Sequence, residues 1–537
     1  MTSKTLKRSA MSQIAPTAVT ETKLAAQAAL RFGRHAAPIV LWASAAILLG
    51  LLVGFASVVL PPTGTFGIVA FVFVILLWVM PDLPIVATGA IRKTFLVMFV
   101  TDLIVPYYYT IQVSGLPWIS VRRVATFAFI MPFLIAVAGS SDVRRRISER
   151  LRSTPLILIC FVGFLSMLFL SMFRSLDPTE TLSSMADAIL SWYVPFFGMV
   201  YIINDDRDVV LIFRIICICA LINAVGGFVE FYFQHKYLLD IFPKGMLANL
   251  LENNQSIRNM LLDPFRDGQY RAASTFMDAL SFGQFEIIAL PIGLFFALHR
   301  NGLFEKSLGW AVVLTTPVAL FCAQARGGWM GLLVSMAVFV VFWSMRKFQA
   351  NKTSLAPGTV GLAGALAFAT ILVLINTWGR AHNMVLGGGN AQYSSDMRQM
   401  QWDAGWPLIF ANPITGHGFS EGAEAIAQPS IDSYPLSLLV ETGVPGLVFF
   451  AGMVLLPVWY GLRNYLIDKS ERGSASGALA CSFIAFVIYS LVLSQRENHM
   501  FIFILVAVFV VTEHRRAKTL LPVRGTETLR VRSVRYG

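Results

Sequence analysis

The stretch FCAQARGGWMGLLVSMAVFV, residues 321–340, places one arginine and two glycines between two apolar segments. An apolar segment of about 20 residues has the length that a helix needs to cross the ~30 Å hydrocarbon core of a bilayer. Arg326 therefore marks a very short turn between two expected membrane-spanning helices. The glycines leave room for backbone or a ligand to approach, and Trp329 can lie at the level of the lipid headgroups.

The same kind of segment recurs along most of the 537-residue chain. Of all residues, 56% are hydrophobic and only 13% are charged, and the mean hydropathy is +0.67. Soluble globular domains do not reach such values. Because backbone polar groups must be satisfied inside a bilayer, runs of this length indicate helices. The sequence therefore predicts an all-α polytopic membrane protein with about 14 transmembrane helices, with 12 to 14 as the range.

The expected organisation alternates membrane helices with two long loops. Lys and Arg collect in the N-terminal tail, in SDVRRRISERLRS and in the C-terminal tail, which places both termini in the cytoplasm and both long loops in the periplasm. The net charge of +12 then reflects topology and contact with anionic lipid, so no nucleic-acid partner is expected. The predicted parts are a tail (1–37), membrane helices (38–234), a periplasmic loop (235–275), further helices (276–376), a large periplasmic loop that is partly helical (377–433), the last helices (434–513) and a tail (514–537).

Several kinds of site find no support in the sequence. The five cysteines all fall in apolar segments, which favours small core residues over disulfides or a zinc site. No arrangement typical of a zinc or serine hydrolase occurs at usable spacing, and VLGGGNAQY (385–393) lacks the context of a nucleotide-binding loop. We therefore expect neither a metal nor a cofactor.

Arginines on the expected periplasmic side are unusual, because membrane insertion works against them. A cationic patch there could hold a phosphate group, since the planar guanidinium binds phosphate in a bidentate way. Each arginine could instead reach the interface or pair with a loop carboxylate. The arginines in question are Arg258, Arg266, Arg271, Arg326, Arg380 and Arg398.

Acidic residues and one histidine near the same face are the second set of candidates. Glu286 lies within a predicted helix, where a carboxylate marks a site or is satisfied by a neighbouring helix. Asp432 lies where the long loop meets the membrane, so it is the candidate base; it could equally cap the following helix. Glu441 and His417 are candidates for substrate binding.

Four motifs together resemble the O-antigen ligase and polymerase superfamily. They are STF…SFGQF after Arg271, QARGGWMGLL (324–333), MRQMQWDAGWPLIFANPITGHGF (397–419) and DSYPLSLLVETGVPGLVFF (432–450). The resemblance covers about residues 265–455, and their order and spacing are more specific than any one motif. It implies a glycosyltransferase at the periplasmic face of the bacterial inner membrane, which uses glycans linked to undecaprenyl diphosphate and needs neither nucleotide sugar nor metal.

The resemblance also implies residue roles. Arg271 and Arg326 match arginines proposed to hold the lipid diphosphate, and Arg398 matches the arginine that opens the loop helix. Asn412, Pro413, Gly416 and Gly418 match a turn of the family. With Asp432 as the base, the remaining candidates for substrate binding are Arg398, Arg266, Arg380, Glu286, Glu441 and His417.

One departure bears on the function. Where many members, ligases above all, have His-Asn, this chain has Asp432-Ser433. The expectation is therefore an inverting polysaccharide polymerase for exopolysaccharide or O-antigen, with a chain-length-regulating co-polymerase as a possible partner. The alternatives are an O-antigen ligase acting on lipid A core, a lipid-linked oligosaccharide flippase, a solute transporter and a scaffold subunit without catalysis.

Overall fold

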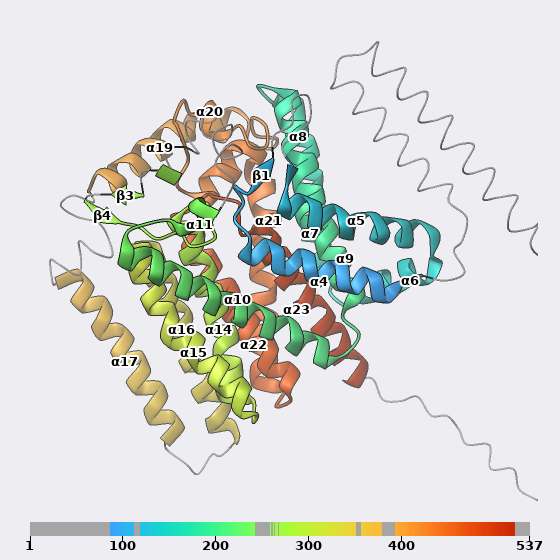
Figure 1. Ribbon diagram of the computed structural model, residues 1–537, viewed down its shortest axis with the longest axis vertical. Helices are drawn as coiled ribbons and strands as arrows, with labels where there is room; N and C mark the ends of the chain where they lie inside the picture. Colours follow the sequence, from blue (N-terminus) through green and yellow to red (C-terminus); the bar gives the residue numbers. More distant parts are fainter. Residues whose placement is uncertain are drawn as a thin grey trace, which may run out of the picture. The chain divides into compact units, whose positions relative to one another are not determined.

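The computed structural model describes residues 86–111, 119–241, 258, 261–262, 264–266, 268–350, 356–377 and 392–520 (Figure 1). All of them belong to one compact unit, residues 82–537. The helices expected within 38–80, and the candidate residue Arg380, lie outside the described residues.

Helices make up nearly all of the regular structure in these ranges. The first half contains α4 (Thr88–Ile104), α5 (Val121–Gly139), α6 (Ser141–Leu151), α7 (Pro155–Ser171), η1 (Met172–Arg174), α8 (Pro178–Ala188), the π-helix η2 (Ile189–Tyr193), α9 (Val194–Ile202), α10 (Asp206–Phe233) and α11 (Tyr237–Ile241). The second half contains α14 (Ala279–His299), α15 (Leu303–Ala323), α16 (Arg326–Ala350), α17 (Ala356–Thr377), α19 (Gln392–Ala411), α20 (Gly422–Ala425), α21 (Tyr434–Ile467), α22 (Glu471–Ser490) and α23 (His499–Leu520). Two antiparallel pairs are short: β1 (Thr110–Ile111) with β2 (Ile119–Ser120), and β3 (Phe265–Arg266) with β4 (Gln269–Tyr270).

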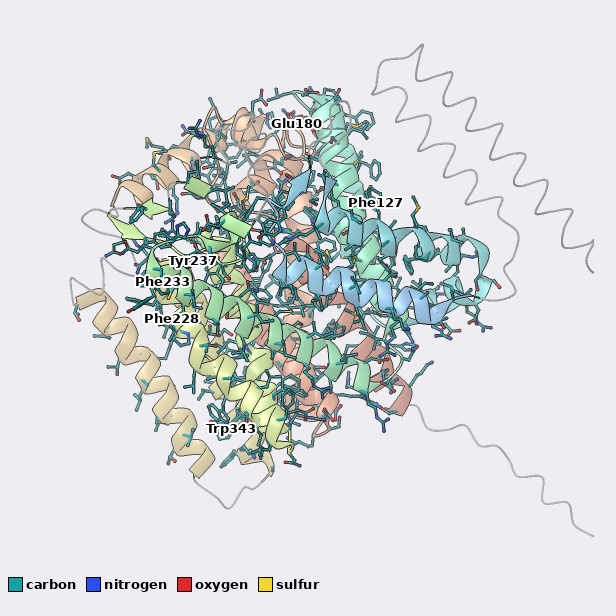
Figure 2. The ribbon with its side chains drawn as sticks, viewed as in Figure 1. Phe127, Glu180, Phe228, Phe233, Tyr237 and Trp343 are labelled. Carbon is teal, nitrogen blue, oxygen red and sulfur yellow. The ribbon has the colours of Figure 1, made fainter. Side chains whose placement is uncertain are left out.

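Nine helical stretches of the described chain are long and apolar enough to cross a membrane. A protein with that many such helices is an integral membrane protein, and the expected fold class is confirmed. The expected total of about 14 is not established by these nine. Large apolar side chains also remain exposed on the helices, as lipid-facing side chains would be; Phe228, Phe233 and Tyr237 are examples along α10 and α11 (Figure 2).

Local sequence signals explain where several helices begin. Ser120 accepts a hydrogen bond from the backbone N–H of Arg123 and so caps α5, whose bounds coincide with the expected 121–139. Pro155 occupies the first turn of α7, where its missing N–H costs nothing. Asp205 and Asp208 form a reciprocal capping box at the start of α10.

Helix α14 lies at the centre of the packing. It is buried along almost its whole length and contacts α10, α15, α16 and α22. Because α14 follows directly on residues 271–278, the core of the bundle fixes the position of that segment.

The described parts of the two long loops have secondary structure of their own. The helix expected around 397–410 is confirmed as α19, which packs Ile409 against Leu436 and Val440 of α21. Figure 1 shows α19 and α20 together at one end of the helices. We call the segments 264–266, 268–278, 322–328, 392–433 and 489–498 the loop-bearing end.

A break in α21 joins this end to the helices. Gly443 has φ 71° and ψ −176°, and its neighbour Val444 donates a backbone hydrogen bond to the carbonyl of Pro413 (2.8 Å). A Cβ atom at Gly443 would overlap the backbone of Ile414. Only glycine therefore combines this backbone conformation with so close an approach.

Candidate functional site

The turn that carries Arg326 is fixed by its neighbours. Gln324, in the left-handed conformation (φ 50°), ends α15, and Arg326 is the first residue of α16. A Cβ atom at Gly327 would overlap the side chain of Val492, and one at Gly328 would overlap Leu320. The two glycines thus give room to protein side chains, which lets the turn pack against the end of α22.

Arg271 contacts the same turn from the other side. Its Nε donates to the carbonyl oxygen of Ala323 (3.3 Å), and the backbone N–H of Ala272 donates to the carbonyl of Cys322 (3.0 Å). Arg271 and Arg326 are 55 positions apart in the sequence, yet both are placed by the end of α15. The structure therefore brings together the two arginines that the sequence singled out.

Two polar residues of α10, which the sequence analysis missed, hold the Arg271 segment in place. The buried carboxylate of Glu230 accepts hydrogen bonds from the Tyr270 hydroxyl (3.1 Å) and from the backbone N–H groups of Ala273 (3.2 Å) and Ser274 (2.8 Å). These donors flank Arg271 on both sides. A buried charge is tolerated when it is hydrogen-bonded in this way.

Asn223, which lies seven residues before Glu230 in α10, is a second anchor for the Arg271 segment. Its side-chain oxygen accepts hydrogen bonds from the hydroxyls of Ser274 (3.2 Å) and Thr275 (2.5 Å), while its amide nitrogen donates to the carbonyl of Leu103 (3.0 Å). Ser274 itself has φ 52°. Such a conformation persists only when the surroundings hold it, and here Glu230 and Asn223 do so.

Arg398 and Asp432 form the second part of the site. The Arg398 Nε lies 3.8 Å from Asp432 Oδ2, and each side chain is about one-third exposed. Gln401 lies one turn further along α19. Its Oε1 accepts a hydrogen bond from the backbone N–H of Asp432 (2.9 Å), and its Nε2 donates one to the carbonyl of Ser430 (3.0 Å). Asp432 is not the helix cap, because Ser433 occupies that position and makes no side-chain capping bond. Its carboxylate therefore remains available beside Arg398.

The segment 489–498 joins the two parts. Val492 packs on Gly327 of the arginine turn, and the Ser494 hydroxyl hydrogen-bonds the carbonyl of Ile431, next to Asp432. Val492 and Ser494 are two residues apart, so their Cα atoms are separated by at most about 7 Å. The arginine turn and the Asp432 loop consequently meet neighbouring points of one short segment.

The same segment also binds the segment that follows Arg271 and helix α21 through its charged residues. Glu497 accepts the backbone N–H of Met277 (3.2 Å), and Arg496 pairs with the buried carboxylate of Glu441. The sequence offered one signal, the run SQREN (494–498) between two apolar helices. A polar run of this length is also typical of a very short connection between two spans, so by itself it does not indicate a site.

Other candidate residues serve mainly as structural contacts or lie apart. Glu441 is held by Arg496 and by the Ser437 hydroxyl (2.7 Å), and His417 lies between the Asn412 amide (3.1 Å) and the carbonyl of Val440 (3.3 Å). Glu286 is fully buried in α14, and neither of its oxygens has a hydrogen-bond partner among the described residues. Arg266 lies in β3, in the loop that precedes Arg271.

No metal centre is evident in the part of the chain that the structure describes, since no group of three or more His, Cys, Asp or Glu residues there could hold an ion. The chemistry available at the loop-bearing end is that of two arginines placed by one turn and a carboxylate beside a third arginine. Fixed cations of this kind stabilise a phosphate leaving group, and a carboxylate can accept a proton.

The fold and this end of the molecule define a polytopic helical membrane protein with a polar site built at the ends of its helices. Residues 310–451 match the family model described as O-antigen ligase, so this part of the chain is similar to the O-antigen ligase and polymerase superfamily. The match includes Arg326, Arg398 and Asp432. Family members are glycosyltransferase-like enzymes of O-antigen pathways. A comparison with curated proteins gives no match.

Proposed function

We propose that the protein is a polysaccharide polymerase, which joins oligosaccharide repeat units linked to undecaprenyl diphosphate. The observation that carries the proposal is the convergence of the Arg271–Arg326 turn and the Asp432 loop on the segment 489–498. A glycosyl transfer from a lipid diphosphate needs cations at the leaving group and an acceptor-side base within one site. The proposal places the site at the periplasmic face of the bacterial inner membrane.

In the proposed reaction, an acceptor hydroxyl attacks the anomeric carbon of the donor's first sugar with inversion. The bond from that carbon to the diphosphate oxygen breaks, undecaprenyl diphosphate leaves, and the hydroxyl proton passes to Asp432. Arg271 and Arg326 stabilise the charge that develops on the diphosphate. Arg398 keeps Asp432 in place, and no step requires a metal.

A ligase that transfers glycan to lipid A core is the second candidate, because the matching family model is described as O-antigen ligase. The aspartate at position 432, where ligases above all have histidine, favours the polymerase. Both functions share the donor, so they differ only in the acceptor.

The test is extension by the purified protein of repeat units linked to undecaprenyl diphosphate, with and without a lipid A core acceptor. We expect a ladder of longer lipid-linked chains in both reactions. Transfer to lipid A core without any ladder would establish the ligase instead. In cells, a deletion strain should accumulate single repeat units on the outer leaflet, whereas accumulation on the inner leaflet would indicate a flippase.

Substitution of Arg326 tests the role of the turn. Arg326→Ala should abolish polymer at a normal protein level, and Arg326→Lys should restore only part of it, because lysine lacks the bidentate geometry of arginine. Wild-type polymer length in both variants would refute the role.

A further inference from the structure

A large cavity lies between α5 and the α8–η2 stretch. Its volume is about 1040 Å³, at the upper end of the range for small-molecule sites. Its walls come from Asp102 and Tyr107, from residues 120–130, from residues 183–192 and from residues 277, 419–420, 495–497 and 500. None of the predicted site residues Arg271, Arg326 and Asp432 lines it.

Arg122 provides a buried polar group that its protein neighbours leave incompletely satisfied. Its Nε donates to the carbonyl of Val105 (2.6 Å), while its NH1 lies 3.6 Å from Asp102 and 3.7 Å from Glu497, both beyond hydrogen-bond distance. Its NH2 has no hydrogen-bond partner among the described residues, although Arg122 is only 7% exposed. Such a group has a large cost unless a ligand or water satisfies it.

Glu497 lies beside Arg122 and also lines the cavity. Burial raises the pKa of Glu497 to about 7, and the nearby Arg122 opposes that rise. At neutral pH this carboxyl is therefore present in both forms, so it can donate or accept a hydrogen bond. Sugar hydroxyls, which also donate and accept, are suitable partners for such a group.

The charges of the lining argue against a diphosphate as the main ligand. The walls include three arginines and three carboxylates, so they carry no excess positive charge when all are ionised; they are Arg122, Arg123, Arg496, Asp102, Asp187 and Glu497. Arg496 is also neutralised by Glu441. A phosphate site should have a surplus of cations, as the Arg271–Arg326 turn has. Balanced charges with serine and aromatic side chains fit an uncharged polyol better.

One wall of the cavity is apolar and continues onto the exterior of the helices. Phe127 and Val124 of α5 line the cavity and are 49% and 56% exposed (Figure 2). Helix α5 is one of the helices long and apolar enough to cross a membrane, and exposed apolar side chains on such a helix are suited to contact with lipid. A ligand could therefore place sugar hydroxyls at Arg122 and Glu497 while an apolar face of the ligand packs against Phe127.

We propose that this cavity binds the sugars of the acceptor glycolipid, with Arg122 and Glu497 as hydrogen-bonding residues. The inference rests on the proposed transfer reaction, in which the donor's diphosphate occupies the Arg271–Arg326 turn. The cavity adjoins that turn along the chain: Met277 follows Arg271 by six positions, and Glu497 follows Val492 by five. An acceptor held there lies next to the segment at which the reacting groups converge.

The experiment uses two probes and follows only the fluorescent product, because the donor also carries an acceptor hydroxyl. The donor is the undecaprenyl-diphosphate repeat unit extracted from a deletion strain. The acceptor is the same oligosaccharide, released from its diphosphate and coupled at its reducing end to a fluorescent alkyl amine, so that it can accept but not donate. Transfer gives the KM of each probe, and fluorescence anisotropy with full-length protein gives direct binding of the acceptor.

Two variants change the cavity in different ways. Ser184→Trp fills it from α8, and Asp187→Asn removes a partly exposed wall carboxylate at little expected cost in stability. We expect the KM and Kd of the acceptor to rise at least about tenfold for Ser184→Trp and about threefold for Asp187→Asn, with the donor KM within about twofold. Ser166→Trp, on an exposed position of α7, is the matched control and should change neither value.

The outcomes separate this inference from the proposed function. An unchanged acceptor Kd in folded Ser184→Trp protein would overturn it, and so would a rise in the donor KM alone. If wild-type protein binds the acceptor probe but transfers nothing from the donor, the proposed polymerase fails, while loss of that binding in Ser184→Trp still supports the cavity as a glycolipid site.

Discussion

Glu230 offers a sharp test of how the site is positioned. It lies on α10, away from the reacting groups, and accepts three hydrogen bonds that flank Arg271. In Glu230→Gln one carboxylate oxygen becomes an NH2 group, so at least one of the three donors faces another donor. Hydrogen bonds to charged groups contribute about 1.5–3 kcal/mol, so the loss of one removes roughly 2 kcal/mol of the free energy that holds the segment 270–274 in place.

That cost should appear in catalysis, because the segment 270–274 places Arg271. If the variant must spend this free energy of roughly 2 kcal/mol to reorder the segment before each transfer, the activation barrier rises by the same amount. The extension rate then falls about 30-fold. The assay is a double-mutant cycle on the extension of lipid-linked repeat units. In the Arg271→Ala background, Glu230→Gln should lower the remaining rate by less than about twofold, because the group that it positions is gone.

Glu305→Gln is the matched control. Glu305 is also a buried carboxylate, paired with Arg214 (2.7 Å) and Arg300 (2.7 Å), but it lies at the opposite end of α15, about 30 Å from the Arg326 turn. It should lower stability without lowering the rate per folded molecule. Equal losses from Glu230→Gln in both backgrounds, or a loss of stability alone, would refute the positioning role.

Three further predictions concern other parts of the site. Asp432→Asn should lower kcat about 10²-fold in the extension assay, as loss of a general base does. The control Asp403→Asn, on the exposed side of α19, should leave kcat unchanged. Equal kcat values for the two variants would exclude Asp432 as the base. Burial raises the folded-state pKa of Glu497 from 4.5 to about 7, so its contribution to stability is fully present below pH 4.5 and is lost as the pH rises through 7. Thermal unfolding of wild type relative to Glu497→Gln should therefore show a loss of about 3 kcal/mol over that window, and a pH-independent difference would contradict it. Gly443→Ala should lower the unfolding temperature, because the added Cβ atom meets the backbone of Ile414 and the residue has a φ of 71°. Gly358→Ala should not lower it, because nothing lies within 4 Å of a Cβ atom there. Equal unfolding temperatures would show that the break in α21 tolerates a side chain.

Much of the fold follows from local sequence. The apolar segment 121–139 becomes α5 with the same bounds, and the helix expected around 397–410 becomes α19. Helices are predictable in this way because hydropathy, capping residues and bonds between neighbouring turns are all properties of one stretch of chain.

Only part of the candidate site could be predicted from the sequence. Arg271, Arg326, Arg398 and Asp432 could be named because arginines and a carboxylate stand out beside apolar segments. Their supporting residues could not, because nothing near Glu230 or Asn223 in the sequence shows that their partners lie 40 to 52 positions later.

Hydropathy and charge along the chain are enough to predict a bundle of membrane helices with charged residues gathered at their ends. Which ends meet is seen only in the folded chain: Arg271 contacts Ala323, the Asp432 loop contacts the segment 489–498, and a cavity opens beside Arg122. The physical reason is that length and hydropathy fix each helix separately, whereas the contacts between loops depend on how α10, α14 and α22 pack together.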